Sequence, residues 1–308
     1  MKVLFAGTPE TAVTALEGLL TSPHEIVGVL TREDAPQGRK RVLTPSPVAR
    51  RAEELGLPII KANRWSLEVQ EQVQALKPQV AAVVAYGTIL PQSALDTLEH
   101  GWVNLHFSNL PLWRGAAPVQ RALMAGEDEI FSCTFLIEAG LDTGPVFMQE
   151  STRVQGDDTA ADILHRLALS GGALLSQTFE KIEQKIAPQP QHGRPTHAAK
   201  LDVSDGKITW SDTTAEIIAR CRGVIPEPGA WCMLEQNRIK IAMVQPSLEK
   251  AAGEYGTVRV LAKKVVVSCS DGCVELTQVQ PAGKKMMNAA DWARGLGKAL
   301  NEQKVVLS

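Results

Sequence analysis

The feature that most constrains the fold of this chain is an alternation of short apolar runs with helical segments in its N-terminal half. Four runs of mostly aliphatic residues stand at 2–6, 26–30, 80–85 and 102–105. Such runs are typical of strands buried on both faces of a parallel sheet. Thr8-Pro9 and Ser46-Pro47 each pair a good N-cap residue with a proline suited to the first helical turn. Strands that alternate with helices predict an α/β domain, doubly wound and Rossmann-like.

The character of the sequence changes after a long helical segment at 160–186. Residues 187–203 are rich in proline and polar side chains, which is typical of a linker. A helix is expected at 214–222, and short β-like runs lie at 231–234, 238–243, 256–260, 265–269 and 274–280. Strands of this length and spacing predict a small OB-like β-barrel. We therefore predict a catalytic domain at 1–186, a linker at 187–203 and a second domain at 204–308.

Composition narrows the class of protein. The chain has 308 residues, 44% of them hydrophobic and 21% charged, which suits two globular domains. No apolar stretch approaches the roughly 20 residues of a membrane span. Five scattered cysteines with no secretory segment before them indicate free thiols in a reducing compartment, so we expect a cytoplasmic protein. The net charge of −2 by itself gives no sign of a nucleic-acid partner.

A polar segment follows the fourth apolar run, at the sheet edge where α/β domains bind ligands. Asn104 and His106 are two residues apart, so in a strand they point to the same side, and an amide beside an imidazole can stabilise an oxyanion. Alternatively, both side chains cap neighbouring backbone. Asp142, between Gly140 and Gly144, is a second candidate, and its alternative is a simple turn in which the carboxylate bonds its own backbone. Spacing alone leaves both alternatives open.

Several motifs, taken in order, resemble the folate-dependent formyltransferases. They are Phe5-Ala6-Gly7-Thr8-Pro9-Glu10, the stretch 43–47, Val84-Ala85-Tyr86-Gly87 with Ile89-Leu90-Pro91, and the segments 103–118, 140–144, 199–201, 208–210 and 280–286. The resemblance spans nearly the whole chain. It implies transfer of a formyl group from 10-formyltetrahydrofolate to the amino group of initiator methionyl-tRNA. We expect the enzyme to be a monomer.

The resemblance also implies roles for individual residues. Asn104, His106 and Asp142 fall on the family's catalytic trio. The folate-contacting residues it implies are Tyr86, Gly87, Ser108, Asn109, Leu110 and Pro111. The family usually has Leu where this chain has Asn109, a change that a backbone contact to folate would survive and a side-chain contact would not. Asn104 and a protonated His106 would stabilise the oxyanion, while Asp142 would hold the imidazole and assist proton transfer. No metal is required.

A run of three cations, Arg39, Lys40 and Arg41, stands in a long loop before the second helix. In the resembled family a loop here reaches the acceptor stem of the tRNA, and adjacent cations attract phosphates. The alternative is a solvated basic loop. The residues that would extend a basic track are Lys200, Lys207, Lys284 and Lys285.

Two other functions fit parts of the sequence. A formyltransferase acting on an amino-sugar nucleotide would share the trio and the C-terminal barrel, but the basic run followed by Thr44-Pro45-Ser46-Pro47 favours the tRNA substrate. A nucleotide-binding module without catalysis is disfavoured, because the first strand–helix turn has the single Gly7 and lacks G-x-G-x-x-G.

Overall fold

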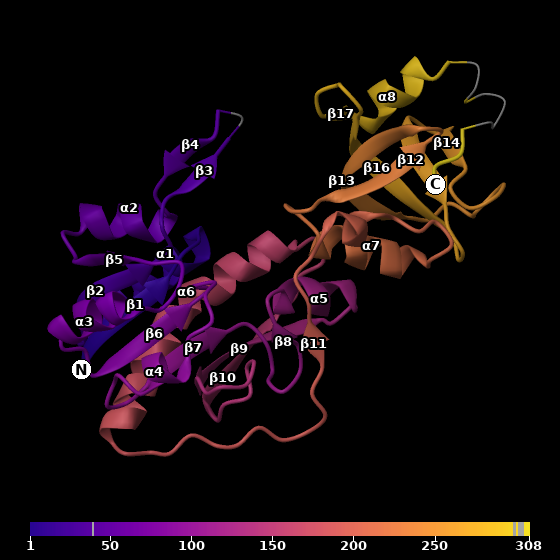
Figure 1. Ribbon diagram of the computed structural model, residues 1–308. Helices are drawn as coiled ribbons and strands as arrows, with labels where there is room; N and C mark the ends of the chain where they lie inside the picture. Colours follow the sequence, from indigo (N-terminus) through magenta and orange to yellow (C-terminus); the bar gives the residue numbers. More distant parts are fainter. Residues whose placement is uncertain (39, 298–299, 301–304) are drawn as a thin grey trace. The chain divides into compact units, whose positions relative to one another are not determined.

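Figure 1 shows the computed structural model, which describes residues 1–38, 40–297, 300 and 305–308. The chain forms two compact units. The first comprises Met1–Gly115, Glu129–Arg153 and Leu164–Ala198. The second comprises Ala116–Asp128, Val154–Ile163 and Ala199–Ser308. No helix in these described ranges is long and apolar enough to cross a membrane.

The first unit is built on a seven-stranded sheet in the order β10-β9-β7-β6-β1-β2-β5. The strands are β1 (Lys2–Gly7), β2 (Glu25–Thr31), β5 (Ile59–Lys61), β6 (Val80–Val84), β7 (Trp102–His106), β9 (Glu129–Leu136) and β10 (Val146–Arg153). The pairs from β5 to β7 are parallel, and β9 and β10 add antiparallel strands beside β7. The predicted α/β class and its four apolar strands are confirmed.

Helices cover this sheet (Figure 1). They are α1 (Glu10–Leu20), α2 (Pro47–Glu54), α3 (Leu67–Ala75), α4 (Gln92–Leu95) and α6 (Ala160–Glu183), whose first residues belong to the second unit. Ser46 caps α2 as predicted, since its hydroxyl accepts the Ala49 N–H at 2.9 Å. The predicted cap of α1 is wrong: Pro9 is the N-cap, and the Thr8 hydroxyl instead donates to the Tyr86 carbonyl at 2.8 Å. Thr8 thereby ties the turn after β1 to the loop after β6.

Two short paired strands stand in the segment where the sequence predicted a long loop. Strands β3 (Ala35–Gln37) and β4 (Val42–Thr44) pair antiparallel. Gly38 and Arg41 have φ angles of 67° and 50°, left-handed values that turn the chain back on itself. Strands of three residues are too short to show a readable alternation of side chains, so the hairpin left no pattern in the sequence.

The segment predicted as a linker is paired over part of its length. Strand β11 (His197–Ala198) lies parallel to β8 (Arg114–Gly115), and Gln189 forms an antiparallel bridge with Val146. The composition of this segment indicates that it is polar, but it does not indicate with which distant backbone groups the segment forms hydrogen bonds.

The second unit contains an antiparallel sheet in the order β12-β13-β16-β15-β14, with β17 beside β16. Its strands are β12 (Ala230–Leu234), β13 (Asn237–Ser247), β14 (Val258–Leu261), β15 (Lys264–Ser268), β16 (Cys273–Pro281) and β17 (Met287–Asn288). Leu307 bridges to Leu234 and Val306 bridges to Thr257, so the chain end joins both edges of the sheet, as in a barrel. The five predicted strands are confirmed, and the OB-like topology stays a prediction.

Helices of this unit include α5 (Pro118–Met124), α7 (Thr214–Gly223), α8 (Ala289–Gly295) and the 3₁₀ turn Val203–Gly206. Helix α5 packs against α7 so closely that a Cβ on Gly223 would lie 2.5 Å from the Met124 side chain. This contact explains why residues 116–128 belong to the second compact unit, whereas the predicted division at 186, which stays a prediction, includes them in the first domain.

Candidate active site

The first two members of the predicted trio lie on β7, at the carboxyl end of the parallel strands. Asn104 pairs with Val83 of β6, and His106 pairs with Cys133 of β9. Strand alternation points Asn104 and His106 to the same side. Asn104 is half-buried and His106 is 6% exposed. Because β7 has neighbours on both sides, the backbone that carries these two side chains is fixed.

Asp142 comes to His106 from a distant part of the chain. Its Oδ2 lies 4.0 Å from Nδ1 of His106, and 14% of its side chain is exposed. The same Oδ2 accepts the Gly115 N–H at 2.7 Å. The carboxylate therefore reaches across to the loop after β7, instead of only closing its own turn.

Glycine makes the Asp142 turn possible. Asp142 itself has a left-handed φ of 51°. A Cβ on Gly144 would lie 1.7 Å from the Leu136 carbonyl oxygen, so no larger residue fits there without moving the backbone of β9. The close approach of this turn to β9 is what brings the carboxylate toward His106.

The surroundings of His106 shift its pKa in opposing directions. Desolvation lowers the pKa of His106 from its ordinary 6.5, while the Asp142 carboxylate and the bond to Trp113 act in the opposite direction. The Nε2 atom lies 3.1 Å from the Trp113 carbonyl, so in the neutral ring Nε2–H donates and Nδ1, turned toward Asp142, is the acceptor. The ring also meets Phe135 edge-on. The lowered pKa favours a neutral imidazole at rest, and the role of a protonated His106 during the reaction stays a prediction.

The predicted folate residues on the loop after β6 offer mainly backbone. Tyr86 is 3% exposed, and its hydroxyl donates to the Ala62 carbonyl at 2.9 Å. Burial raises the pKa of Tyr86, so the phenol stays neutral. Gly87 has a φ of 80°, and its carbonyl accepts a bond of 3.4 Å from Arg32.

The predicted folate turn at 108–111 also uses its side chains internally. The Ser108 hydroxyl donates to the Leu112 carbonyl at 2.7 Å, and Leu110 is buried. Asn109 accepts a bond of 3.1 Å from Gln149 through its Oδ1. The peptide bond between Leu110 and Pro111 is cis. A contact between folate and this turn through backbone atoms would be compatible with all four residues, and it stays a prediction.

Comparison with known proteins identifies the family. Residues 1–179 match the model of the formyl transferase domain, and residues 200–297 match that of the formyl transferase C-terminal domain. Methionyl-tRNA formyltransferase of Paenarthrobacter aurescens (strain TC1) is 52% identical over 297 residues, which covers 96% of this chain and 97% of that protein. This chain belongs to the methionyl-tRNA formyltransferase family. The resemblance to folate-dependent formyltransferases is confirmed.

Solved structures share the fold at low identity. HypX from Aquifex aeolicus, in complex with tetrahydrofolic acid, has a TM-score of 0.64 and 16% identity over 96% of this chain. The chain spans about half of HypX, 47% of its length. The N-formyltransferase from Helicobacter canadensis, in complex with folinic acid and dTDP-3-aminofucose, has a TM-score of 0.67 and 18% identity, covering 90% of this chain and 98% of that one. The enzyme solved with a sugar nucleotide is thus only a distant structural neighbour of this chain.

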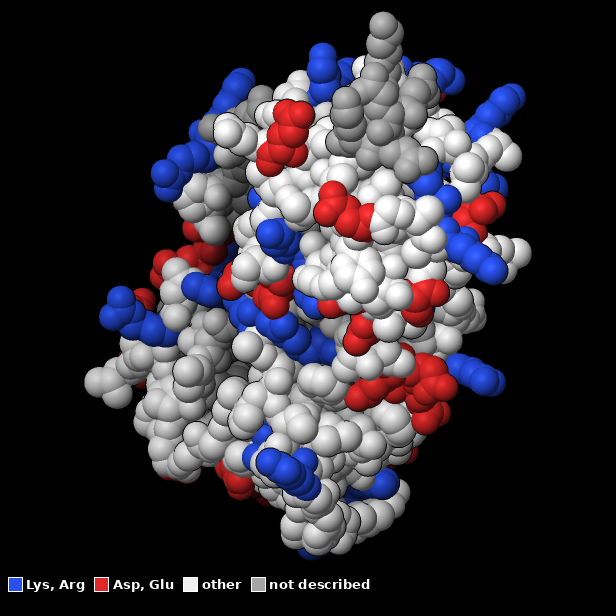
Figure 2. Space-filling model, turned by 90° about the vertical axis from the view of Figure 1, so that its right-hand side faces the viewer, with Lys and Arg blue, Asp and Glu red and all other residues white. Residues whose placement is uncertain are grey.

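Lys40 and Arg41 of the basic run lie between β3 and β4. Arg39 is outside the described residues. Lys40 and Arg41 are exposed, and beside them Val42 and Leu43 are 59% and 67% exposed. In Figure 2 the Lys and Arg side chains of the visible face are interspersed with Asp and Glu, so no continuous basic band marks this view. The described part of the hairpin thus exposes both cationic and apolar side chains, and its contact with tRNA stays a prediction.

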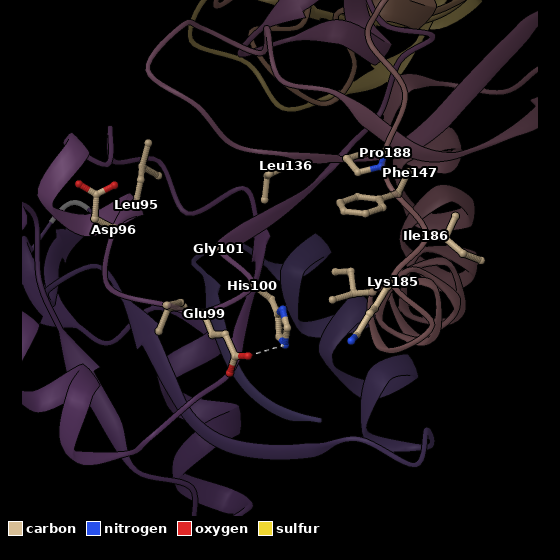
Figure 3. A pocket seen from close by; sticks show the side chains of 12 residues that line it. Leu95, Asp96, Glu99, His100, Gly101, Leu136, Phe147, Lys185, Ile186 and Pro188 are labelled. Atoms are coloured by element: carbon tan, nitrogen blue, oxygen red, sulfur yellow. Dashed lines mark ion pairs between the residues drawn. The ribbon is translucent and has the colours of Figure 1, made fainter.

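A separate pocket of about 550 Å³ lies elsewhere in the first unit (Figure 3). It is bordered by residues after α4 and at the end of α6, and it holds the Glu99–His100 ion pair at 3.8 Å. None of the predicted site residues lines it. Across the described residues no group of three His, Cys, Asp or Glu side chains could hold a metal ion, and the expectation of a metal-free enzyme stays a prediction.

Sequence reasoning missed two residues that touch this site. Arg114 and Gln191 bond each other through their side chains, and Gln191 also bonds the backbone of the Asp142 turn. Arg114 stood inside a motif quoted for the family, but Gln191 lay in a polar stretch whose composition indicated only a linker.

Proposed function

We propose that this chain transfers the formyl group of 10-formyltetrahydrofolate to the α-amino group of initiator methionyl-tRNA. The observation that carries the proposal is the 52% identity to a methionyl-tRNA formyltransferase over 96% of the chain. The paired His106 and Asp142 beside Asn104, at the carboxyl edge of the sheet, supply the acid–base chemistry that such a transfer needs.

The proposed reaction is acyl transfer without a covalent enzyme intermediate. The amine of the acceptor attacks the formyl carbon, a C–N bond forms, and the formyl oxygen gains negative charge. Asn104 donates a hydrogen bond to that oxygen. Neutral His106 accepts the proton of the attacking amine, and Asp142, 4.0 Å away, stabilises the resulting imidazolium. When the bond to N10 of the folate breaks, the proton passes to that nitrogen.

The β3–β4 hairpin is proposed to contact the tRNA. Lys40 and Arg41 are exposed at its tip, next to the exposed Val42 and Leu43. Cations there attract phosphates, and the apolar side chains fit against sugars or unstacked bases. Arg39 is included in the proposal on the sequence alone. The second unit is proposed to add RNA contacts, with Lys207 and Lys284 among the candidates.

We further propose a metal-free, monomeric, cytoplasmic enzyme. All five cysteines are free and buried, as expected of a protein that works in a reducing compartment. The donor site is proposed to use the backbone of residues 86–87 and 108–111. Full activity after treatment with EDTA, and a single species of the chain's mass by light scattering, are the outcomes that these proposals require.

One assay tests the function directly. The purified chain is incubated with 10-formyltetrahydrofolate and, in parallel, charged initiator tRNA, charged elongator methionyl-tRNA or a dTDP-amino sugar. We expect formylation of the initiator tRNA to dominate. Formylation of the sugar nucleotide with none of either tRNA would overturn the proposal and favour the sugar-nucleotide alternative.

A further inference from the structure

Residues 189–198, called the strap below, contact two segments of the candidate site: the chain after the Asp142 turn and the loop that carries Trp113. Gln189 exchanges two backbone hydrogen bonds with Val146, at 2.7 and 2.8 Å. Farther along, the Thr196 carbonyl accepts the Arg114 N–H at 2.9 Å, and the Thr196 hydroxyl accepts the Trp113 N–H at 2.8 Å. The strap therefore touches the chain just after the Asp142 turn and also the loop that carries Trp113, the partner of His106.

Gln191 stands between these two anchors and is half-buried. Its Nε2 donates to the carbonyls of Asp142 and Gly144, both at 2.8 Å. Its Oε1 accepts from Nη2 and Nε of Arg114, at 2.6 and 3.2 Å. The amide thus uses both of its donor hydrogens and receives two bonds on its oxygen. Only a side chain with both donors and an acceptor at this reach can make this set.

These bonds close a circuit around the catalytic carboxylate. Asp142 holds Gly115 through Oδ2, the neighbouring Arg114 holds Gln191, and Gln191 holds the carbonyl of Asp142. Asp142 is otherwise in a turn with a left-handed φ, a conformation that must be stabilised by its surroundings. The circuit thus constrains the backbone of Asp142, whose Oδ2 lies 4.0 Å from Nδ1 of His106.

We propose that Gln191 is a positioning residue for formyl transfer, which holds Asp142 at working distance from His106 through this circuit. The inference rests on the proposed function, since it takes the trio as the catalytic groups. Gln191 reaches the reaction only through Asp142 and Arg114. Its loss is therefore expected to slow the chemical step without removing the donor site.

The test compares three variants of the full chain. Gln191→Leu removes all four bonds at similar size. Gln191→Glu keeps an acceptor for Arg114 but loses both donors to the turn carbonyls. Gln189→Leu is the matched control, because Gln189 lies on the same strap and its exposed side chain donates to the nearby Ala187 carbonyl at 3.4 Å instead of to the Asp142 turn.

For each variant, kcat, KM for 10-formyltetrahydrofolate and the binding stoichiometry of tetrahydrofolate are measured, with the melting temperature as a check of folding. We expect Gln191→Leu to lower kcat by about 10- to 100-fold, the effect of misplacing a catalytic group by about 1 Å. Gln191→Glu should fall nearly as far, while KM and stoichiometry stay at wild-type values and Gln189→Leu behaves as wild type.

Two outcomes would overturn the inference. One is a kcat for Gln191→Leu within about twofold of wild type, below any positioning effect. The other is a loss of activity that parallels an equal loss of folate-binding sites, which would mean that Gln191 serves only folding. Failure of the wild-type chain to formylate tRNA would instead refute the proposed function, and the kcat ratios would then be measured with the acceptor that is used.

Discussion

Replacing Asp142 with Asn isolates the charge of the carboxylate from its shape. The Asn side-chain oxygen can still accept the Gly115 N–H, now at 2.7 Å from Oδ2, so the turn keeps its bond to the loop. What disappears is the negative charge 4.0 Å from Nδ1 of His106. In the proposed reaction that charge stabilises the imidazolium formed as the amine loses its proton.

The distance sets the size of the effect. Two unit charges 4.0 Å apart attract by about 4 kcal/mol at an effective dielectric constant of 20. Since 14% of the Asp142 side chain is exposed, water screens part of this attraction. A loss of about 2 to 4 kcal/mol of transition-state stabilisation corresponds to a rate that falls roughly 30- to 1000-fold. The pKa of His106 should also fall further below 6.5 in the variant, because the variant lacks the carboxylate that opposes the effect of burial in the wild type.

Single-turnover formylation with saturating donor measures the rate, and an NMR titration of the His106 ring measures its pKa. Asp96→Asn, an exposed position in the same unit, is the control for loss of one negative charge. A rate for Asp142→Asn within about threefold of wild type, together with an unchanged pKa of His106, would refute the electrostatic role of the carboxylate.

Three further predictions concern His106, the Asp142 turn and the hairpin. Because the pKa of His106 is lowered in the folded chain, the unfolded chain binds more protons below pH 6.5, and the free energy of unfolding should fall as the pH drops below that value. Denaturant unfolding of wild type and His106→Asn should therefore give free energies of unfolding that diverge below pH 6.5. The same dependence on pH in both proteins would contradict the argument from burial. Gly144→Ala places a Cβ 1.7 Å from a β9 carbonyl and should cost at least about 1–3 kcal/mol of stability, together with activity, in urea unfolding and turnover assays; wild-type values in both would show that the turn can move freely. Replacing Arg39, Lys40 and Arg41 by Ala should reduce the slope of log tRNA affinity against log salt by about 2 to 3 units and leave donor affinity unchanged; equal slopes would leave the run as a solvated surface.

The fold was largely predictable where its signals are local. The aliphatic runs that became β1, β2, β6 and β7 are buried on both faces, so their composition alone indicates parallel strands. Ser46 caps α2 because capping depends on residues within one turn. Thr8 is an equally good N-cap residue by type, but its hydroxyl donates to the Tyr86 carbonyl, 78 residues away. No local rule of capping includes such a partner.

The candidate site divides in the same way. The alternation of side chains along a strand was enough to place Asn104 and His106 on one side of β7. The approach of Asp142 to His106 depends on a glycine-containing turn packed against β9. The hydrogen bond from Gln191 to the Asp142 carbonyl depends on a segment almost 50 residues further along the chain. Neither contact has a periodic or compositional signature. From the sequence, the polar residues 189–198, which bond to the Asp142 turn, were therefore indistinguishable from a linker.

By itself the sequence determined the alternating strands and helices, the short strands of the second unit and, through ordered motifs, the family, while the roles of the trio stay a prediction. The tertiary structure alone decided the assignment of α5 to the second unit, the pairing of the strap, and the direction in which the pKa of His106 shifts. The reason is physical: secondary structure follows from interactions within a few residues. A pKa, in contrast, follows from desolvation and from charges that only folding brings within a few ångströms. The sequence thus predicted that an imidazole would act here, while the burial of His106 on β7, between β6 and β9, lowers its pKa, which no local pattern shows.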